Sequence, residues 1–489
     1  MGIKLIRKNT IFKPDSTRVL ARFFNLSDNR KEKVIRRVLT LTSVEKETIL
    51  NQLLRNFSKR HRSVVDIWER NFKRSMEAPL AEDIVNYNYT LRDRLIIGAY
   101  FTMEYSVEAA AFFNPSIIES PDQTQLQHGQ KRIILSFRAT GEGHVSSIVF
   151  RSGIIDENLD IHLDEVGKLL EKPKRFKNHV YQKNDFFAKL YNIDPVDDDF
   201  VEVILKRFPD NFTYEELSNI IRELKEEYKA NPEHIKFISH ILWLASSHYQ
   251  ITYSLDTSIS ERVIFPISDT ERNGIEDARF LKFDHENGSP MYYATYTAYD
   301  GSMIMPKLLS TKDFISFKVQ PINGKIANKG AAMFPKKING KYAMLCRIDG
   351  ENNYISFSDD LINWHEDVTL LREPQYHWEF IQIGNCGSPI ETSKGWLVLT
   401  HSVGPMREYS ISVSLLDLND PTKIIGRLNE PLMYPNKIER EGYVPNVVYS
   451  CGQIVHNGHL IIPYAMSDHS STYATIKLDD LLEELIKNG

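Results

Sequence analysis

Gly274-Ile275-Glu276-Asp277-Ala278-Arg279 is a short polar motif that is followed by an alternating strand segment, Met291 to Thr297. The same arrangement occurs five times in the chain, and the other four motifs begin at Phe113, Ala331, Gly384 and Gly442. The last four copies start roughly 55 residues apart, a period that is typical of arrays of supersecondary units. Because each copy carries its own hairpin, we predict an all-β fold, a five-bladed β-propeller with four strands in each blade.

Helical patterns lie outside the repeats. Thr42 to Glu45 and Thr213 to Glu216 are capping boxes, and apolar residues follow each of them at helical spacing. The predicted organisation is a helical N-terminal segment (1–109), blade 1 (110–155), a helical insertion (156–249), blades 2–5 (250–480) and a C-terminal tail (481–489). The two helical blocks could pack together as one module against the propeller.

Composition excludes several classes of partner. The chain has 489 residues, 42% of them hydrophobic, and a net charge of −5, so it has no global basic field that would attract nucleic acid. No segment reads as a secretory signal or as a membrane span, which predicts a cytoplasmic protein without a membrane partner, and a homo-oligomer remains open. The three cysteines leave an odd thiol and favour a reducing compartment.

A propeller gathers the innermost strands of all blades around one axis, so polar residues of distant repeats become neighbours. The strand-borne candidates are Arg138, Asp277, Arg279, Lys329, Arg347, His401 and Asp468. Arginine suits bidentate recognition of an oxyanion, and a carboxylate among sugar hydroxyls can act as general acid or bind the ring. Each residue alone could equally be a salt bridge or a core residue. Their common register across the repeats favours a binding site for a sugar and an anion.

The motifs also form a specific ordered set. They are Phe113-Asn114-Pro115, Ser136-Phe137-Arg138-Ala139, the Gly274 to Arg279 motif, Phe334 to Tyr342, Asp359 to Trp364 and Val444 to Gly452. This set resembles glycoside hydrolase family 130, the β-mannoside phosphorylases and mannosidases. The resemblance covers residues 110 to 155 and 255 to 480 and leaves out the helical segments.

The resemblance implies an inverting enzyme that cleaves β-mannosides at one mouth of the propeller. Asp277 would be the general acid, acting through a hydroxyl of the mannosyl unit, while inorganic phosphate attacks the anomeric carbon from the opposite face. Substrate-binding residues would be Arg138 and Asp468, with Asn114, Glu276, Arg279 and Tyr299 as further candidates. The predicted phosphate ligands are Lys329, Arg347 and His401. Phosphate is the expected co-substrate, with no metal and no other cofactor.

One departure from the family pattern keeps hydrolysis open. Family phosphorylases carry a lysine two residues before a glycine in the fourth repeat, where this chain has Gln382 before Gly384. A hydrolase needs a carboxylate base to activate water, and Glu379 or Glu408 could supply it. We expect phosphorolysis to mannose 1-phosphate and keep the inverting β-mannosidase as the alternative. Two further alternatives are a non-catalytic carbohydrate-binding or protein-interaction propeller, and a retaining glycosidase with carboxylates about 5 Å apart.

Overall fold

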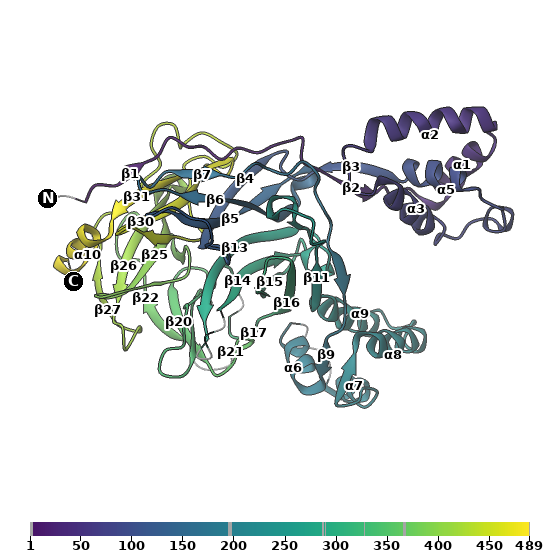
Figure 1. The fold of residues 1–489 in the computed structure, drawn as a ribbon. Helices are drawn as coiled ribbons and strands as arrows, with labels where there is room; N and C mark the ends of the chain where they lie inside the picture. The colour runs from purple at the N-terminus through teal and green to yellow at the C-terminus, as the bar shows by residue number, and fades with distance from the viewer. Residues whose placement is uncertain are drawn as a thin grey trace.

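Antiparallel sheets form the body of the protein, and two helical lobes project from one side of it (Figure 1). The structure, a computed structural model, describes residues 3–193, 198–285, 288, 290–326, 328–364 and 368–488. Both chain ends lie on the side of the body opposite the lobes.

The first two repeat units are continuous with each other. The first unit contains β4 (Ala111–Glu119), β5 (Lys131–Thr140) and β6 (Ser146–Ile155), and the second contains β13 (Gly274–Asp284), β14 (Pro290–Tyr299), β15 (Ile304–Thr311) and β16 (Ser316–Pro321). Neighbouring strands within each unit are antiparallel. A parallel contact of Gly274 with Ser146 joins β13 to β6, so both units belong to one 11-stranded sheet.

Three further sheets follow in chain order. The third unit contains β18 (Ala332–Met333), β19 (Tyr342–Cys346), β20 (Asn353–Ser358) and β22 (Thr369–Arg372), and the fourth contains β23 (Gln382–Asn385), β25 (Gly395–Val403), β26 (Tyr409–Leu416) and β27 (Ile424–Arg427). The last contains β28 (Val448–Tyr449), β30 (His459–Met466), β31 (Ser470–Lys477) and β1 (Ile6–Arg7). Strand β1 pairs with β31, so the two ends of the chain meet in one sheet.

The core lies between successive units. Separate apolar clusters join the first unit to the second, the second to the third, the third to the fourth and the fourth to the last. A further cluster places Ile461 and Tyr473 of the last unit against Phe112 and Ile133 of the first. This cyclic order of packing is that of a propeller-type fold. The count of five separate four-stranded blades stays a prediction.

The remaining short elements are β12 (Val263–Ile264), β17 (Asn323–Gly324), β21 (Asn363–Trp364), β24 (Ile390–Thr392), β29 (Ile454–His456) and the 3₁₀ turns η1 (Glu142–His144), η2 (Ile259–Glu261), η3 (Asp269–Glu271) and η4 (Pro405–Arg407). Strands β12, β24 and β29 pair with β6, β25 and β30.

The N-terminal lobe contains both helices and strands. Its helices are α1 (Asp28–Leu39), α2 (Ser43–Phe57), α3 (Val64–Ser75), α4 (Glu82–Val85) and α5 (Leu91–Tyr100), and β2 (Val19–Phe23) pairs with β3 (Thr102–Ser106). At the start of α2, Thr42 and Glu45 form both hydrogen bonds of a capping box. The description of residues 1–109 as helical was therefore incomplete, because the segment also supplies β1 to the last sheet.

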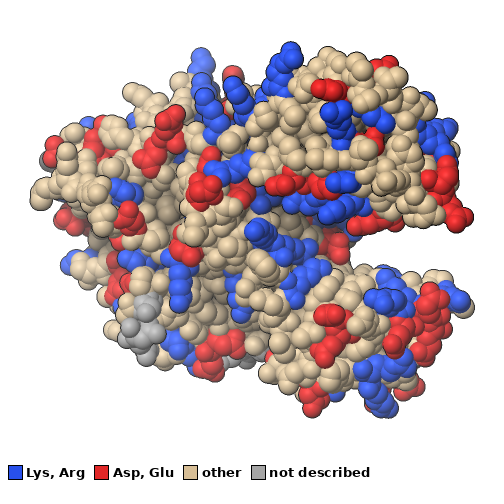
Figure 2. Space-filling view, turned by 45° about the vertical axis from the view of Figure 1, so that its right-hand side comes forward, with Lys and Arg blue, Asp and Glu red and all other residues tan. Residues whose placement is uncertain are grey.

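The insertion is also mixed in structure. It contains β7 (Ile161–Leu163), β8 (Lys174–Phe176), β9 (Val180–Gln182), α6 (Lys183–Ile193), α7 (Asp198–Leu205), β10 (Asn211–Thr213), α8 (Tyr214–Glu227), α9 (Pro232–Ser246) and β11 (Tyr249–Thr252). Strands β11 and β8 continue the second unit beyond β16. The two helical blocks do not form one module, because they project as separate lobes with an indentation between them (Figure 2).

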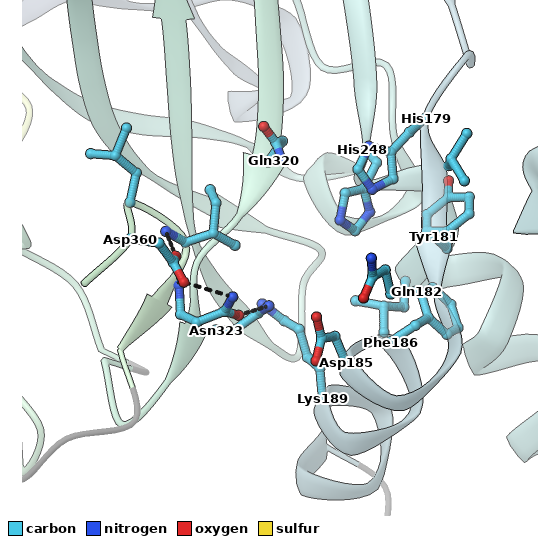
Figure 3. A pocket seen from close by; sticks show the side chains of 15 residues that line it. His179, Tyr181, Gln182, Asp185, Phe186, Lys189, His248, Gln320, Asn323 and Asp360 are labelled. Atoms are coloured by element: carbon cyan, nitrogen blue, oxygen red, sulfur yellow. Dashed lines mark hydrogen bonds between the residues drawn. The ribbon is translucent and has the colours of Figure 1, made fainter. Parts of the chain in front are cut away.

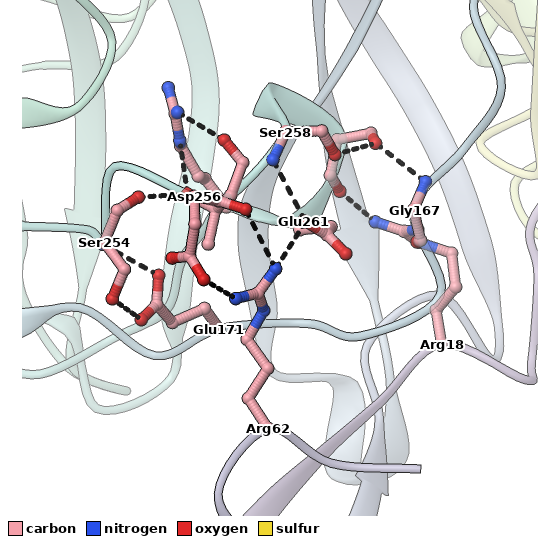
Figure 4. A network of polar contacts seen from close by, with 11 residues as sticks. Arg18, Arg62, Gly167, Glu171, Ser254, Asp256, Ser258 and Glu261 are labelled. Carbon is pink, nitrogen blue, oxygen red and sulfur yellow. Dashed lines mark hydrogen bonds and ion pairs between the residues drawn. The ribbon is translucent and has the colours of Figure 1, made fainter. Parts of the chain in front are cut away.

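Polar contacts hold the N-terminal lobe against the body (Figure 4). Arg62, just before α3, pairs with Asp256 at 3.0 Å and with Glu261 at 3.1 Å. Arg18 is buried against Glu108 at 2.7 Å, and Glu108 also binds Arg151 at 2.7 Å. Such a buried group of charges is stable only because its members satisfy one another.

The C-terminal end of the chain is helical. Helix α10 (Leu478–Lys487) buries Leu481, Leu482 and Leu485 against the fourth and last sheets. Within the described residues, no helix is both long and apolar enough to span a membrane.

Candidate active site

Two β-bulges at equivalent places in the first two units aim polar side chains toward each other. The pairing of β4 with β5 shifts between Phe113 and Ser116, and the pairing of β13 with β14 shifts between Glu276 and Arg279. Asn114 and Asp277 lie inside these bulges with φ of 49° and 55°. A positive φ is costly for residues other than glycine, and bulges commonly re-aim side chains beside functional sites.

The two side chains meet in a charged cluster. Asn114 Nδ2 donates to Asp277 Oδ1 at 2.7 Å, and Arg138 Nη1 lies 3.4 Å from the same oxygen. Arg138 Nη2 donates to Glu276 Oε1 at 2.9 Å, while Lys329 Nζ donates to Glu276 Oε2 at 2.6 Å. The first three units therefore contribute two cations and two carboxylates to one polar group.

The carboxylates of this cluster differ in their affinity for protons. Burial alone would raise the pKa of Asp277, but Arg138, Arg279, the bond from Asn114 and Lys329 together hold it below 3.8. Asp468, in the turn between β30 and β31, behaves in the opposite way. Burial and the charge of Asp277 outweigh the attraction of Arg138 and raise the pKa of Asp468 to about 6.

Arg347 and His401 lie beside this cluster on the third and fourth units. Among the described residues, Arg347 donates only to backbone carbonyls, those of Lys329 at 3.5 Å and Gly350 at 3.3 Å. His401 is 2% exposed. Burial and the charges of Arg347 and Arg279 hold its pKa well below 6.5, so its imidazole is neutral.

His401, a predicted phosphate ligand, is therefore not a cation. Arg279 differs from its predicted role. It is 1% exposed, and its guanidinium donates to the backbone oxygens of Asp277, Asn385 and Cys386 and to the Tyr449 hydroxyl. With its donors used inside the protein, Arg279 positions the bulge of Asp277 and does not present its guanidinium to a substrate.

The two proposed bases for water activation are engaged elsewhere. Glu379 is fully buried, pairs with Arg372 at 2.7 Å and accepts from the backbone N–H groups of Gln375 and Tyr376. Its carboxylate is therefore engaged within the protein, and its role as the base stays a prediction. Glu408 is partly exposed at η4 and pairs with Arg440 at 2.8 Å.

Tyr299 belongs to the edge of the cluster. Lys329 Nζ lies 5.8 Å from the centroid of its ring, and its hydroxyl donates to the backbone of Gly301. The predicted residues that the structure joins through side-chain contacts are thus Asn114, Arg138, Glu276, Asp277 and Lys329. Arg279 and Arg347 contact this group through the backbone oxygens of Asp277 and Lys329.

Tyr449 and Gly384 were missed as site residues by the sequence argument. The ring of Tyr449 lies 4.7 Å from that of His401, and its hydroxyl accepts from Arg279 at 2.8 Å. A Cβ at Gly384 would come within 2.3 Å of the His401 ring, so only glycine fits there. Both residues stand inside quoted repeat motifs, and that recurrence was the available signal. Among the described residues, no group of three or more His, Cys, Asp or Glu side chains could hold a metal ion.

Comparison with known proteins places this site in a family. Residues 233–487 match the sequence profile of glycoside hydrolase family 130, described as β-1,4-mannooligosaccharide phosphorylase. The chain belongs to glycoside hydrolase family 130. This family-130 chain is therefore an enzyme that acts on β-mannosides. The resemblance of residues 110 to 155 lies outside the matched range.

Individual relatives of this family-130 chain are mannoside phosphorylases. A 1,2-β-oligomannan phosphorylase of Thermoanaerobacter sp. is 36% identical over 220 residues, which cover 44% of this chain and 72% of that protein. A β-1,2-mannobiose phosphorylase of Listeria innocua is 30% identical over 45% of this chain and 63% of that protein. A β-1,4-mannooligosaccharide phosphorylase of Ruminococcus albus is 35% identical over 32% of this chain and 50% of that protein.

Among solved structures, that of the Listeria innocua β-1,2-mannobiose phosphorylase with β-1,2-mannobiose aligns with a TM-score of 0.46 at 23% identity. The alignment covers 78% of this chain and 93% of that one.

Proposed function

We propose that this enzyme cleaves β-mannosides by inverting phosphorolysis, releasing mannose 1-phosphate. The main support for the proposal is that Arg347 has no carboxylate partner in the described part of the chain, whereas the two carboxylates that hydrolysis could use are both in ion pairs. Among the described residues, the Arg347 guanidinium has only backbone partners, which leaves its charge available for phosphate. Glu379 is buried in an ion pair and Glu408 is paired with Arg440.

In this proposal the mannosyl unit binds over Asp277, Arg138 and Asp468. A phosphate oxygen forms a bond to the anomeric carbon from the face opposite the leaving sugar, while the bond from that carbon to the glycosidic oxygen breaks. The proton that the leaving oxygen needs comes from Asp277 through a mannosyl hydroxyl. Arg347 and Lys329 bind the phosphate, and the neutral imidazole of His401 can add one hydrogen bond.

The low pKa of Asp277 requires an explanation, because a general acid must carry a proton. Arg138, Arg279 and Lys329 hold Asp277 ionised in the unliganded enzyme. A bound phosphate places negative charge beside the same cations, which weakens their hold and raises the pKa of Asp277. Phosphate binding would then prepare the acid as well as supply the nucleophile.

The test is to incubate the enzyme with β-1,2- and β-1,4-mannobiose, with and without phosphate, and to quantify mannose and mannose 1-phosphate. We expect mannose 1-phosphate, formed only with phosphate. Arg347→Ala should raise the KM for phosphate at least tenfold more than the KM for the mannoside, which corresponds to about 1.4 kcal/mol. Arg427→Ala, on the outer strand β27, is the matched control and should change neither constant.

Gln382→Lys tests the missing cation separately. If the site is a phosphorylase pocket with one cation fewer, the added ammonium should lower the KM for phosphate. Free mannose released at a rate indifferent to phosphate would contradict phosphorolysis and favour the inverting mannosidase. Hydrolysis is kept as the second candidate because of Gln382 and because Lys329 already pairs with Glu276.

A further inference from the structure

A cavity of about 360 Å³ lies between the insertion and the body (Figure 3). Its walls come from β9, α6 and the end of α9 on the insertion side, and from β16, β17 and the turn at 360–363 on the other side. None of the residues of the candidate active site lines it. A volume of this size suits a small molecule.

Lys189 spans this cavity from α6 toward the strand that bears Asn323 (Figure 3). Its ammonium donates to the backbone oxygen of Ile322 at 2.5 Å. Among the described residues, no carboxylate pairs with it. Burial and the charge of Lys307 lower the pKa of Lys189 to about 7. The surroundings of this amine therefore disfavour its protonated, positively charged form.

Two histidines form the back of the cavity. The rings of His179 and His248 stack with their centroids 4.5 Å apart. Burial and Lys318 lower the pKa of His179 to about 4, and burial, His179, Lys189 and Lys307 hold that of His248 well below 6.5. Each of the charges that lower these two pKa values is positive. One of these cations, Lys318, lines the adjoining smaller cavity.

Two residues that line the cavity, His248 and Asn323, also carry buried polar atoms. Within the described residues, His248 Nδ1 and Asn323 Oδ1 are buried without a hydrogen-bond partner. A buried polar atom without a partner costs free energy, and a ligand would remove that cost.

Two carboxylates, Asp185 and Asp360, also line the cavity, together with Lys189. Asp360 accepts the backbone N–H groups of Ile362 and Asn363 and the side-chain amide of Asn363. Asp185 is exposed on the first turn of α6, and Glu271 is paired with Lys307 behind the wall.

The aromatic residues argue against a sugar as the ligand. Tyr181 and Phe186 line the cavity but are 2% and 5% exposed, and the Tyr181 hydroxyl donates to Ala245. Carbohydrate recognition by stacking requires an open ring face, which neither of them offers.

We propose that this cavity binds a small organic anion whose carboxylate or phosphate oxygens accept hydrogen bonds from Lys189 and from the N–H groups of His179 or His248. The anion would bind across the joint between the insertion and the body, so the ligand would stabilise that joint. The site is separate from the mannoside site, and its existence does not depend on phosphorolysis.

The experiment is trace acetylation of the intact enzyme, with the labelling of each lysine quantified by mass spectrometry. The probes are citrate, mannose 1-phosphate and inorganic phosphate at equal ionic strength. At a concentration ten times the Kd, about 90% occupancy should lower labelling of Lys189 about tenfold. Citrate and mannose 1-phosphate distinguish a carboxylate ligand from a phosphate ester. Lys206 and Lys229, which are 74% and 75% exposed on the same insertion, are internal controls and should not change.

The same mass spectra distinguish the two sites. Labelling of Lys329 measures phosphate binding at the active site, and labelling of Lys189 measures anion binding in the cavity. Thermal unfolding provides the second measurement. The protecting anion should raise the Tm of the wild type and of Lys206→Met but not of Lys189→Met. The proposal is overturned if no probe protects Lys189 or shifts the Tm selectively. It is also overturned if β-1,2-mannobiose without an anion protects Lys189 equally.

Discussion

Asp277 combines two features at the scale of a single residue, an unfavourable backbone angle and a depressed side-chain pKa. Both are maintained by neighbours, namely Asn114 and Arg138 from the first unit and the buried Arg279 from the same strand. A residue held so firmly in a costly state is a strong candidate for a reacting group.

We expect Asp277→Asn to lower turnover by about two to four orders of magnitude, because a general acid contributes about that much. The amide preserves size and the fold should persist, which circular dichroism and the Tm can check. The loss should be smaller for aryl mannosides, whose leaving groups hardly need a proton. An equal loss on both substrates would show that Asp277 only maintains the structure.

We expect ionised Asp468 to lower the stability of the folded state although the proposed mechanism needs this residue for activity. Its pKa rises from 3.8 to about 6 on folding, so the ionised form destabilises the folded state once the pH exceeds both values. Two pKa units correspond to about 2.7 kcal/mol. Asp468→Asn should therefore raise the free energy of unfolding at pH 8 and lose this advantage near pH 4, while its activity falls. Denaturant titrations at the two pH values measure the difference, and an advantage of the same size at both would contradict the electrostatic cause.

At the scale of elements, a buried ion pair joins β15 to η3 beside the insertion. Lys307 and Glu271 are fully buried and lie 2.7 Å apart, and Tyr249 and Tyr296 donate to the same carboxylate. Lys307 and these hydroxyls lower the pKa of Glu271 to about 2 against the effect of burial. The stability that Glu271 contributes is therefore present above pH 4.5 and is lost as the pH falls toward 2.

Lys307→Met should lower the free energy of unfolding by about 3–5 kcal/mol at pH 7, because it leaves a buried carboxylate without its cation. The double variant Lys307→Met, Glu271→Gln should recover most of that loss, since it removes both charges. Chemical denaturation of the three proteins measures these differences. If the double variant were no more stable than Lys307→Met, the unpaired charge would not be the cause.

At the scale of the whole molecule, the N-terminal lobe is attached to the body partly through Arg62 (Figure 4). Its ion pairs are partly exposed, so each contributes at most about 1 kcal/mol. Arg62→Ala should therefore leave global stability and activity almost unchanged but speed hydrogen exchange at the base of α3. Arg36→Ala, which breaks ion pairs within the lobe, should not affect that base. A large loss of activity in Arg62→Ala would show that the lobe positions the active site.

Local features were readable from the sequence alone. The dipeptides Asn339-Gly340 and Asn457-Gly458 are typical of tight hairpins, and all four residues have positive φ. The first turn is closed by the bridge of Ile338 with Lys341 and the second joins β29 to β30. The capping boxes at Thr42 and Thr213 formed as written. Turns and caps depend on a few adjacent residues. The recurrence of the motifs, in contrast, indicated that residues of distant repeats such as Arg138 and Asp277 would become neighbours, and they do.

Only the tertiary structure decided how individual charges are used. Arg279 donates to the backbone oxygen of Cys386, 107 residues away, and this contact keeps its guanidinium inside the protein. Arg7 on β1 pairs with Glu439, near the other end of the chain. Burial places Glu379 in an ion pair with Arg372 and keeps the imidazole of His401 neutral. A residue type and its spacing determine what a side chain can do. Its solvent exposure and its partners depend on distant segments that meet only when the sheets pack, so the sequence predicted which side chains would lie together but not their charge states.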